Sequence, residues 1–289
     1  MPDSSSAMTS AMATMAQASA GSMKLILPSR IDPMLTRELI SIHQAPREVP
    51  PFSERYPGLT PQAGYAAARG LHEHRLSAGW RRVGRKIGFT NRGIWPRYGV
   101  FEPIWGSVYD RTLVRARQHG ARVPLEGLVN PRIEPEICFG LRTAPGTAPL
   151  IECIEWMAHS VEIVQCHHPA WKLTLADSIA DNGLHGRLIL GETSPLPADA
   201  EVRLPGLQVE LYRAGELVDS GAGANVLDSP LKALGHLVQL LAAHGAPPLE
   251  AGEIVTTGVI TDAHPVKRGE TWRTRLAGVD LPGLTLEFT

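Results

Sequence analysis

Cysteine is scarce in this chain of 289 residues, which contains only Cys138, Cys153 and Cys166. An odd and sparse set does not form the disulfide framework that is typical of small secreted domains. We therefore expect a protein of a reducing compartment and assign it to the cytoplasm. Two histidines follow Cys166, but no second Cys/His pair stands at the spacing of zinc ligands, so we do not expect zinc there.

An excess of charge of one sign is also missing, because 28 Lys and Arg face 29 Asp and Glu and the formal net charge is -1. Without a long basic run, the sequence gives no reason to expect a nucleic-acid partner. No stretch approaches about 18 consecutive apolar residues, so we expect no membrane span. The sequence also lacks a Walker loop, a dinucleotide fingerprint, a nucleophile elbow and an internal repeat.

The sequence divides into three parts. Residues 1–22 are mostly Ser, Ala, Met and Thr and lack the pattern of a signal peptide, so we expect a disordered extension. The rest, with 43% hydrophobic residues in the whole chain, is long enough for a proper core. We expect a region of helices and strands over 23–125 and a strand-rich region over 126–289.

Local patterns predict the elements of these regions. Asp32-Pro33 and Thr60-Pro61 combine an N-cap with proline at the first helical position, which predicts a helix after each. Helical spacing predicts further helices over 150–159, 173–181 and 229–245. Alternation and apolar runs predict strands over 81–90, 105–109, 131–141, 160–166, 186–190, 207–212, 253–259, 271–276 and 284–288.

The strand predicted over 131–141 carries two glutamates on one face. Glu134 and Glu136 are two positions apart, so their carboxylates point the same way, roughly 6–7 Å apart. Like charges this close repel unless they face water or share a cation. The pair is therefore either a solvated strand face or half of an oxygen-ligand site for a hard divalent metal. Pro135 between them places the strand at a sheet edge or at an irregularity.

Two further charged residues lie in otherwise apolar strands. Glu162 stands in the middle of an apolar run, where a carboxylate is costly unless it is paired or bound to a cation. It is either a third metal ligand or a hydrogen-bonded structural carboxylate. Lys86 faces away from the apolar side of its own strand, between two glycines that leave room for a ligand. It is either an active-site lysine or a solvated strand lysine.

Five segments then form a pattern in one order: 84–90, 131–137, 161–164, 171–174 and 180–182. In this order they resemble the 2-keto-4-pentenoate hydratase / 4-oxalocrotonate decarboxylase family, within the fumarylacetoacetate hydrolase superfamily. The resemblance runs from about Met23 to the end of the chain and includes 252–258 and 265–269. It implies an α+β fold, with a mixed β-roll core and flanking N-terminal helices, and a homo-oligomer that can associate with a sister enzyme of its pathway.

The resemblance also implies a site for Mg²⁺ or Mn²⁺. The family's metal carboxylates correspond to Glu134, Glu136 and Glu162, and its active-site lysine corresponds to Lys86. Beside the metal and in a buried place, we expect a depressed pKa for this lysine. Further residues fall in segments that line the family's pocket: Lys172 as a catalytic residue, and Asp181, Asn182 and Thr257 as substrate-binding residues.

Two departures from the family pattern affect the reaction. Ile104 stands where hydratases of the family usually carry an Asp, and an apolar side chain cannot relay a proton. Gly183-Leu184-His185 replaces the small residues and serines that commonly follow Asp-Asn. His185 is a candidate to replace the missing relay, with a structural histidine as the alternative, and Glu102 or Asp110 is a candidate to supply an acid.

The function implied by the resemblance is a divalent-metal-dependent lyase acting on an unsaturated 2-oxo acid. We expect a hydratase that adds water to a 2-hydroxy-2,4-dienoate in aromatic catabolism. A 4-oxalocrotonate-type decarboxylase is the alternative, because both reactions need the same electron sink and a fold does not fix a reaction. A C–C hydrolase of the acylpyruvate type and a non-catalytic partner subunit remain further alternatives.

Overall fold

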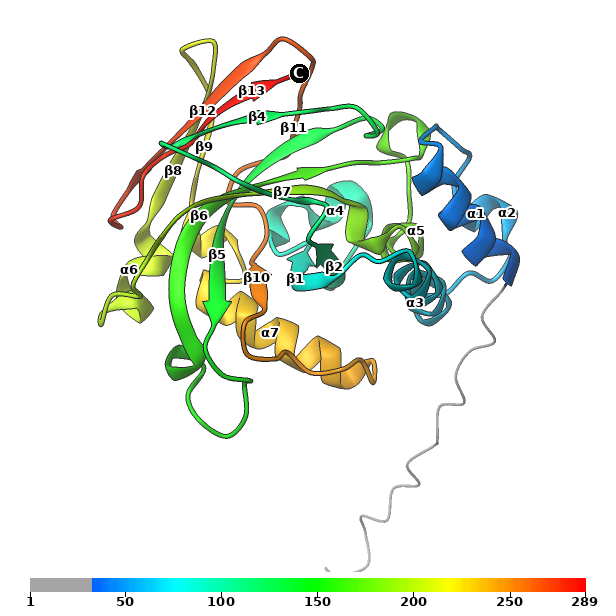
Figure 1. The fold of residues 1–289 in the computed structure, drawn as a ribbon, viewed down its shortest axis with the longest axis horizontal. Coiled ribbons are helices and arrows are strands. Elements are labelled where there is room, and N and C mark those ends of the chain that lie inside the picture. Colours follow the sequence, from blue (N-terminus) through cyan, green and yellow to red (C-terminus); the bar gives the residue numbers. More distant parts are fainter. Residues whose placement is uncertain (1–32) are drawn as a thin grey trace, which may run out of the picture.

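Two β-sheets form the centre of the computed structural model, which describes residues 33–289 (Figure 1). The larger sheet contains β1 (Arg82–Gly88), β2 (Ile104–Tyr109), β3 (Leu113–Arg115), β5 (Arg132–Leu141), β6 (Ile154–Val164), β7 (His185–Ser194), β10 (Ile254–Thr256) and β11 (His264–Pro265). Its order is β2-β1-β10-β5-β6-β7-β3, and β11 pairs with β5 beside β10. Parallel and antiparallel pairs occur together, so the sheet is mixed.

The smaller sheet closes one side of the larger one. Its strands are β4 (Gly120–Val123), β8 (Gln208–Arg213), β9 (Glu216–Ala222), β12 (Thr271–Ala277) and β13 (Thr285–Phe288), in the order β4-β13-β12-β8-β9. Apolar side chains from both sheets form one buried cluster: Ile133, Val161, Ile163 and Ile189 with Leu211, Trp272, Leu286 and Phe288. Because side chains alternate along a strand, the glutamates next to Ile133 and Ile163 face the other side of the large sheet.

The helices lie around these sheets. They are α1 (Pro33–Gln44), α2 (Phe52–Arg55), α3 (Pro61–Ser77), α4 (Trp95–Tyr98), α5 (Leu175–Ala180), α6 (Ala200–Gly206) and α7 (Pro230–Ala243). Short 3-10 helices are η1 (Arg92–Ile94), η2 (Leu150–Cys153), η3 (Pro169–Trp171), η4 (Asn182–Leu184) and η5 (Gly223–Asn225). The first three helices and α5 gather at the end of the molecule opposite the small sheet (Figure 1). Among the described residues, no helix is both long and apolar enough to cross a membrane.

The predicted fold class is confirmed, and so are the helices that begin after Asp32 and Thr60. The hydroxyl of Thr60 caps α3 by accepting a hydrogen bond from the backbone N–H of Ala63. The predicted extension, 1–22, lies outside the described residues. The two predicted regions on either side of residue 125 both contribute strands to the large sheet.

One local prediction needs correction, and for Pro135 the structure selects one of two predicted alternatives. The helix predicted over 150–159 is wrong, because only η2 is helical there and the chain continues as β6. Pairing of β6 with β5 and β7 along its length outweighs the helical spacing of its apolar residues. Pro135 does not lie on an edge strand, since β5 is central. It lies at an irregularity, between the β5 residues that pair with β10 and those that pair with β11.

Candidate metal centre and active-site pocket

Three glutamates meet on the face of the large sheet that points away from the small sheet. In the β5–β6 ladder Glu134 lies directly opposite Glu162, and Glu136 lies opposite Ser160. One oxygen atom from each glutamate lies within 4.8 Å of the others. Glu136 and Glu162 are fully buried, while Glu134 keeps partial access to solvent. The structure thus brings together the three residues predicted to be metal ligands, and their role stays a prediction.

The surroundings of the cluster fit a hard divalent cation. One oxygen of Glu136, Oε2, accepts hydrogen bonds from the Thr256 hydroxyl and from the Gly258 N–H, 2.9 Å away. The other oxygen, Oε1, is buried without a hydrogen-bond partner among the described residues. Burial, reinforced by the neighbouring carboxylates, holds the pKa of Glu136 well above its usual range and raises the pKa of Glu134 to about 7. A cation bound by the three carboxylates would remove this penalty.

Lys86 places a positive charge in direct ionic contact with the cluster. It lies on β1, and its Nζ is 3.0 Å from Glu162 Oε2 and donates to the Gly183 carbonyl over 2.9 Å. Burial alone would lower its pKa, but Glu162, Glu134 and Glu136 raise it above the ordinary value. Without a cation the three carboxylates outweigh desolvation, and the depressed pKa expected beside a bound metal stays a prediction.

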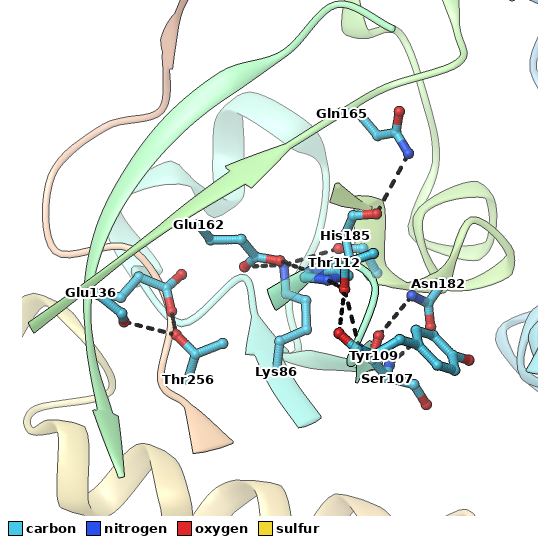
Figure 2. Close-up of polar contacts among 12 residues, drawn as sticks. Lys86, Ser107, Tyr109, Thr112, Glu136, Glu162, Gln165, Asn182, His185 and Thr256 are labelled. Atoms are coloured by element: carbon cyan, nitrogen blue, oxygen red, sulfur yellow. Dashed lines mark hydrogen bonds and ion pairs between the residues drawn. The ribbon is translucent and has the colours of Figure 1, made fainter. Parts of the chain in front are cut away.

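His185 contacts the second carboxylate oxygen of Glu162 (Figure 2). Its Nδ1 lies 2.7 Å from Glu162 Oε1, and its Nε2 lies 2.8 Å from the hydroxyl of Thr112. The carboxylate accepts from the Nδ1–H, and Nε2 is within hydrogen-bond distance of the Thr112 hydroxyl, so both ring nitrogens are engaged. His185 is buried and does not line the pocket described below. This placement favours the structural alternative, in which His185 orients a metal-ligand carboxylate.

The predicted substrate-binding residues of the 181–182 segment are engaged with protein groups. Asp181 is fully buried and accepts from His43 Nε2 over 2.8 Å and from His167 Nδ1 over 2.7 Å. The side-chain amide of Asn182 bonds both backbone groups of Ser107 in β2, over 2.9 and 3.0 Å. These contacts fix η4, which presents the Gly183 carbonyl to Lys86. The geometry supports an anchoring role for both residues.

A pocket opens in front of Lys86 and Glu134. Its other lining residues are Gly88, Phe89, Ile94, Arg97, Ile104, Val164, Trp171, Leu173, Gly183, Leu184, Gly258, Val259, Asp262 and Ala263. Most of them are apolar, and charged groups occur only beside the glutamate cluster and in the ion pair of Arg97 with Asp262. The arrangement can hold an acidic head group at the metal end and a small carbon skeleton along the wall.

Three further predicted site residues also lie outside this pocket. Glu102 and Lys172 are exposed and do not line it. Thr257 is buried, and its hydroxyl donates to the Ile137 carbonyl over 2.8 Å. Their catalytic and substrate-binding roles stay predictions. Sequence reasoning missed Thr112 and Thr256, because a lone threonine carries no signal until a fold places it beside a histidine or a carboxylate.

No family model matches the chain, but individual relatives do. It is 34% identical over 223 residues to the TodF product hydratase of Pseudomonas putida, covering 75% of this chain and 81% of that protein. It is 30% identical over 248 residues to a 2-keto-4-pentenoate hydratase of Paraburkholderia xenovorans, covering 84% of this chain and 90% of that protein. It is 33% identical over 203 residues to a 4-oxalocrotonate decarboxylase of a Pseudomonas species, covering 69% of this chain and 76% of that protein.

Solved structures agree with these relatives. The 4-oxalocrotonate decarboxylase from Pseudomonas putida G7, complexed with magnesium and adipate, superposes with a TM-score of 0.80 at 27% identity over 89% of this chain and 96% of that one. Fumarylpyruvate hydrolase from Pseudomonas aeruginosa, in complex with Mn²⁺ and pyruvate, shares the fold with a TM-score of 0.52 at 14% identity over 72% and 89%. The chain therefore belongs to the 2-keto-4-pentenoate hydratase / 4-oxalocrotonate decarboxylase family, as the sequence resemblance implied.

Proposed function

We propose that this protein is a divalent-metal-dependent lyase that adds water to a 2-hydroxy-2,4-dienoate, the enol of an unsaturated 2-oxo acid, in aromatic catabolism. The observation that carries the proposal is the Lys86 ammonium 3.0 Å from Glu162, inside a cluster of three carboxylates at the base of an apolar pocket. Relatives named as hydratases of this type support it.

The chain's own residues have distinct tasks in this reaction. Glu134, Glu136 and Glu162 would hold Mg²⁺ or Mn²⁺, which supplies a Lewis acid for the 2-oxo acid head group. Net hydration places a proton on C5 and hydroxide on C4, while the enol proton moves to C3. Lys86 lines the pocket with an ammonium group, so it is positioned to give and take a proton. The apolar wall excludes bulk water from the conjugated system.

A decarboxylase acting on a 4-oxalocrotonate-type substrate is the second candidate, and one observation favours it. Ile104 lines the pocket opposite Gly88, and a β-carbon added to Gly88 would come 3.3 Å from Lys86 Nζ and 3.5 Å from Ile104. The lysine thus has an apolar neighbour where the family's hydratases usually carry an Asp. Loss of CO₂ from a vinylogous carboxylate does not need that acid.

A paired assay separates the candidates. We would follow 2-hydroxypenta-2,4-dienoate and 4-oxalocrotonate side by side by ultraviolet absorbance, with Mg²⁺ or Mn²⁺ and with an EDTA control. Metal-dependent conversion of the dienoate to a 4-hydroxy-2-oxo acid is the expected result. Release of CO₂ from 4-oxalocrotonate would establish the decarboxylase instead. Metal binding with neither reaction would favour a C–C hydrolase or a non-catalytic partner subunit.

We also propose that the protein is a cytoplasmic homo-oligomer that can associate with a sister enzyme. The exposed apolar side chains of Phe101, Val202 and Leu217 are candidate contact points, and all three cysteines are unpaired and buried. Sedimentation velocity over a range of concentrations tests the assembly. A monomer at all concentrations would contradict it.

A further inference from the structure

The wall of the pocket beyond the glutamates and Lys86 is apolar and comes from five separate parts of the chain. We call Phe89, Val164, Leu173, Leu184 and Val259 the tail wall. Phe89 follows β1, and Val259 lies in the segment after β10. Val164 is the last residue of β6, Leu173 precedes α5, and Leu184 belongs to η4. Val164, Leu184 and Val259 are buried, while the other two are half-buried. A ligand whose acid end lies at Lys86 would place its remaining carbon atoms against this surface.

The charged groups of the pocket are already engaged. Lys86 is bound to Glu162, at the metal end. Arg97 lies 3.1 Å from Asp262, and the two side chains are 62% and 40% exposed, so this ion pair stands at the solvent-facing mouth. Among the described residues that line the pocket, no other cation is present to receive a second carboxylate.

We propose that the protein selects 2-oxo acids whose tail is uncharged and apolar, and that the tail wall is the specificity determinant. The inference rests on the proposed function, because it places the substrate's acid end at Lys86 and the glutamates. A carboxylate at the far end of the ligand would lose water without gaining a counter-charge, which is costly. Each methylene buried against the tail wall should instead improve binding about fourfold.

Binding of unreactive 2-oxo acids tests this without turnover. We would measure the Kd values of 2-oxobutanoate, 2-oxopentanoate and 2-oxohexanoate by calorimetry at saturating Mg²⁺. The decisive comparison is 2-oxohexanoate with 2-oxoadipate, which has the same chain length and one more carboxylate. We expect Kd to fall about fourfold per methylene and 2-oxoadipate to bind at least about tenfold more weakly than 2-oxohexanoate. A flat series, or equal binding of 2-oxoadipate, overturns the proposal.

A charge placed in the tail wall should reverse the preference. Leu173 is half-buried in the segment between η3 and α5, so a long side chain there disturbs no regular element. Leu173→Arg should make 2-oxoadipate bind at least as well as 2-oxohexanoate, while the matched control Leu173→Met should keep the order of the unmodified protein. If 2-oxoadipate still binds more weakly than 2-oxohexanoate to Leu173→Arg, Leu173 is not part of the specificity determinant. The ligand series on the unmodified protein remains decisive if this variant does not fold.

The binding series and the turnover assay can fail independently. A Kd that falls with tail length while no dienoate is hydrated would refute the hydratase and leave the apolar-tail preference standing. Hydration of 2-hydroxypenta-2,4-dienoate with a flat series would refute the tail preference alone. As a positive check on turnover, kcat/KM for 2-hydroxyhexa-2,4-dienoate should exceed that for the pentadienoate by about fourfold.

Discussion

Glu134 and Glu162 occupy directly opposed positions of the β5–β6 ladder, so two carboxylates face each other across neighbouring strands. Like charges in opposed positions destabilise a sheet. Here a third carboxylate, Glu136, joins them, and Lys86 makes an ionic contact with Glu162. The cluster therefore lowers the stability of the metal-free sheet, and a bound divalent cation should restore it.

Removing one carboxylate tests the ligand assignment. Glu134→Gln should weaken Mn²⁺ binding by at least about a hundredfold, more than the loss of an outer partner usually costs. The metal-free protein should be as stable as before or more stable, because one of the repelling charges is gone. Calorimetric titration with Mn²⁺ and urea unfolding in EDTA measure the two effects.

Glu155→Gln is the matched control for this change, because Glu155 is an exposed glutamate on β6. It should alter neither metal affinity nor stability. Full metal-dependent activity in Glu134→Gln would remove the ligand assignment.

Lys86→Met should separate chemistry from metal binding. Turnover should fall about 10²- to 10⁴-fold, because the proposed proton-transfer group is lost. Unfolding in EDTA should become easier by about 3 kcal/mol, since buried Glu162 loses its ionic partner, and saturating Mn²⁺ should restore most of that loss. Single-turnover kinetics and urea unfolding with and without metal provide the readouts.

Lys172→Met is the control for the lysine change. Lys172 is exposed and outside the pocket, so we expect activity within about twofold of normal, as for a surface substitution. A hundredfold loss in this control would instead support the catalytic role that the family resemblance implied.

His185 should act on the metal through Glu162. His185→Gln and Thr112→Val should each weaken Mn²⁺ binding about 10- to 100-fold, whereas Thr112→Ser keeps the hydroxyl and should bind normally. Calorimetry at fixed pH gives the affinities, and kcat is measured at saturating metal. If His185→Gln binds Mn²⁺ normally but loses kcat, the histidine takes part in the chemistry and the orienting role is refuted.

Buried histidines should make the fold sensitive to acid. Burial lowers the pKa of His43 and of His159 from 6.5 to about 4. Between pH 6.5 and pH 4 the folded state therefore binds fewer protons than the unfolded state. The free energy of unfolding keeps its full value above pH 6.5 and decreases as the pH falls to 4. Each group should contribute roughly 3 kcal/mol to that fall. Urea unfolding at several pH values between 7.5 and 4.5 measures it.

His43→Gln isolates one of these contributions. Glutamine can still donate to Asp181, and the difference between the two proteins cancels the pH dependence of the glutamate cluster. The variant should lose less stability than the unmodified protein between pH 6.5 and 4.5. Parallel pH curves for His43→Gln and the unmodified protein would contradict the prediction.

Local pattern was sufficient for part of this molecule. Alternation predicted that Glu134 and Glu136 share one strand face. The capping patterns in the sequence at Asp32 and Thr60 predicted two helices. Both kinds of feature depend only on neighbours in the chain. The same reasoning failed over 150–159, where local spacing indicated a helix and pairing with two strands produced β6.

The sequence by itself determined which residues could form a metal site, since an acidic residue in an apolar strand needs a partner whatever the fold. Only the tertiary structure decided that Glu162 lies opposite Glu134 and that Lys86 contacts Glu162. It also decided that His43 contacts Asp181 and that Thr112 contacts His185. The physical reason is that strand register and helix docking join residues far apart in the chain. Their contacts depend on burial and pairing energies of the whole fold, which no local periodicity contains.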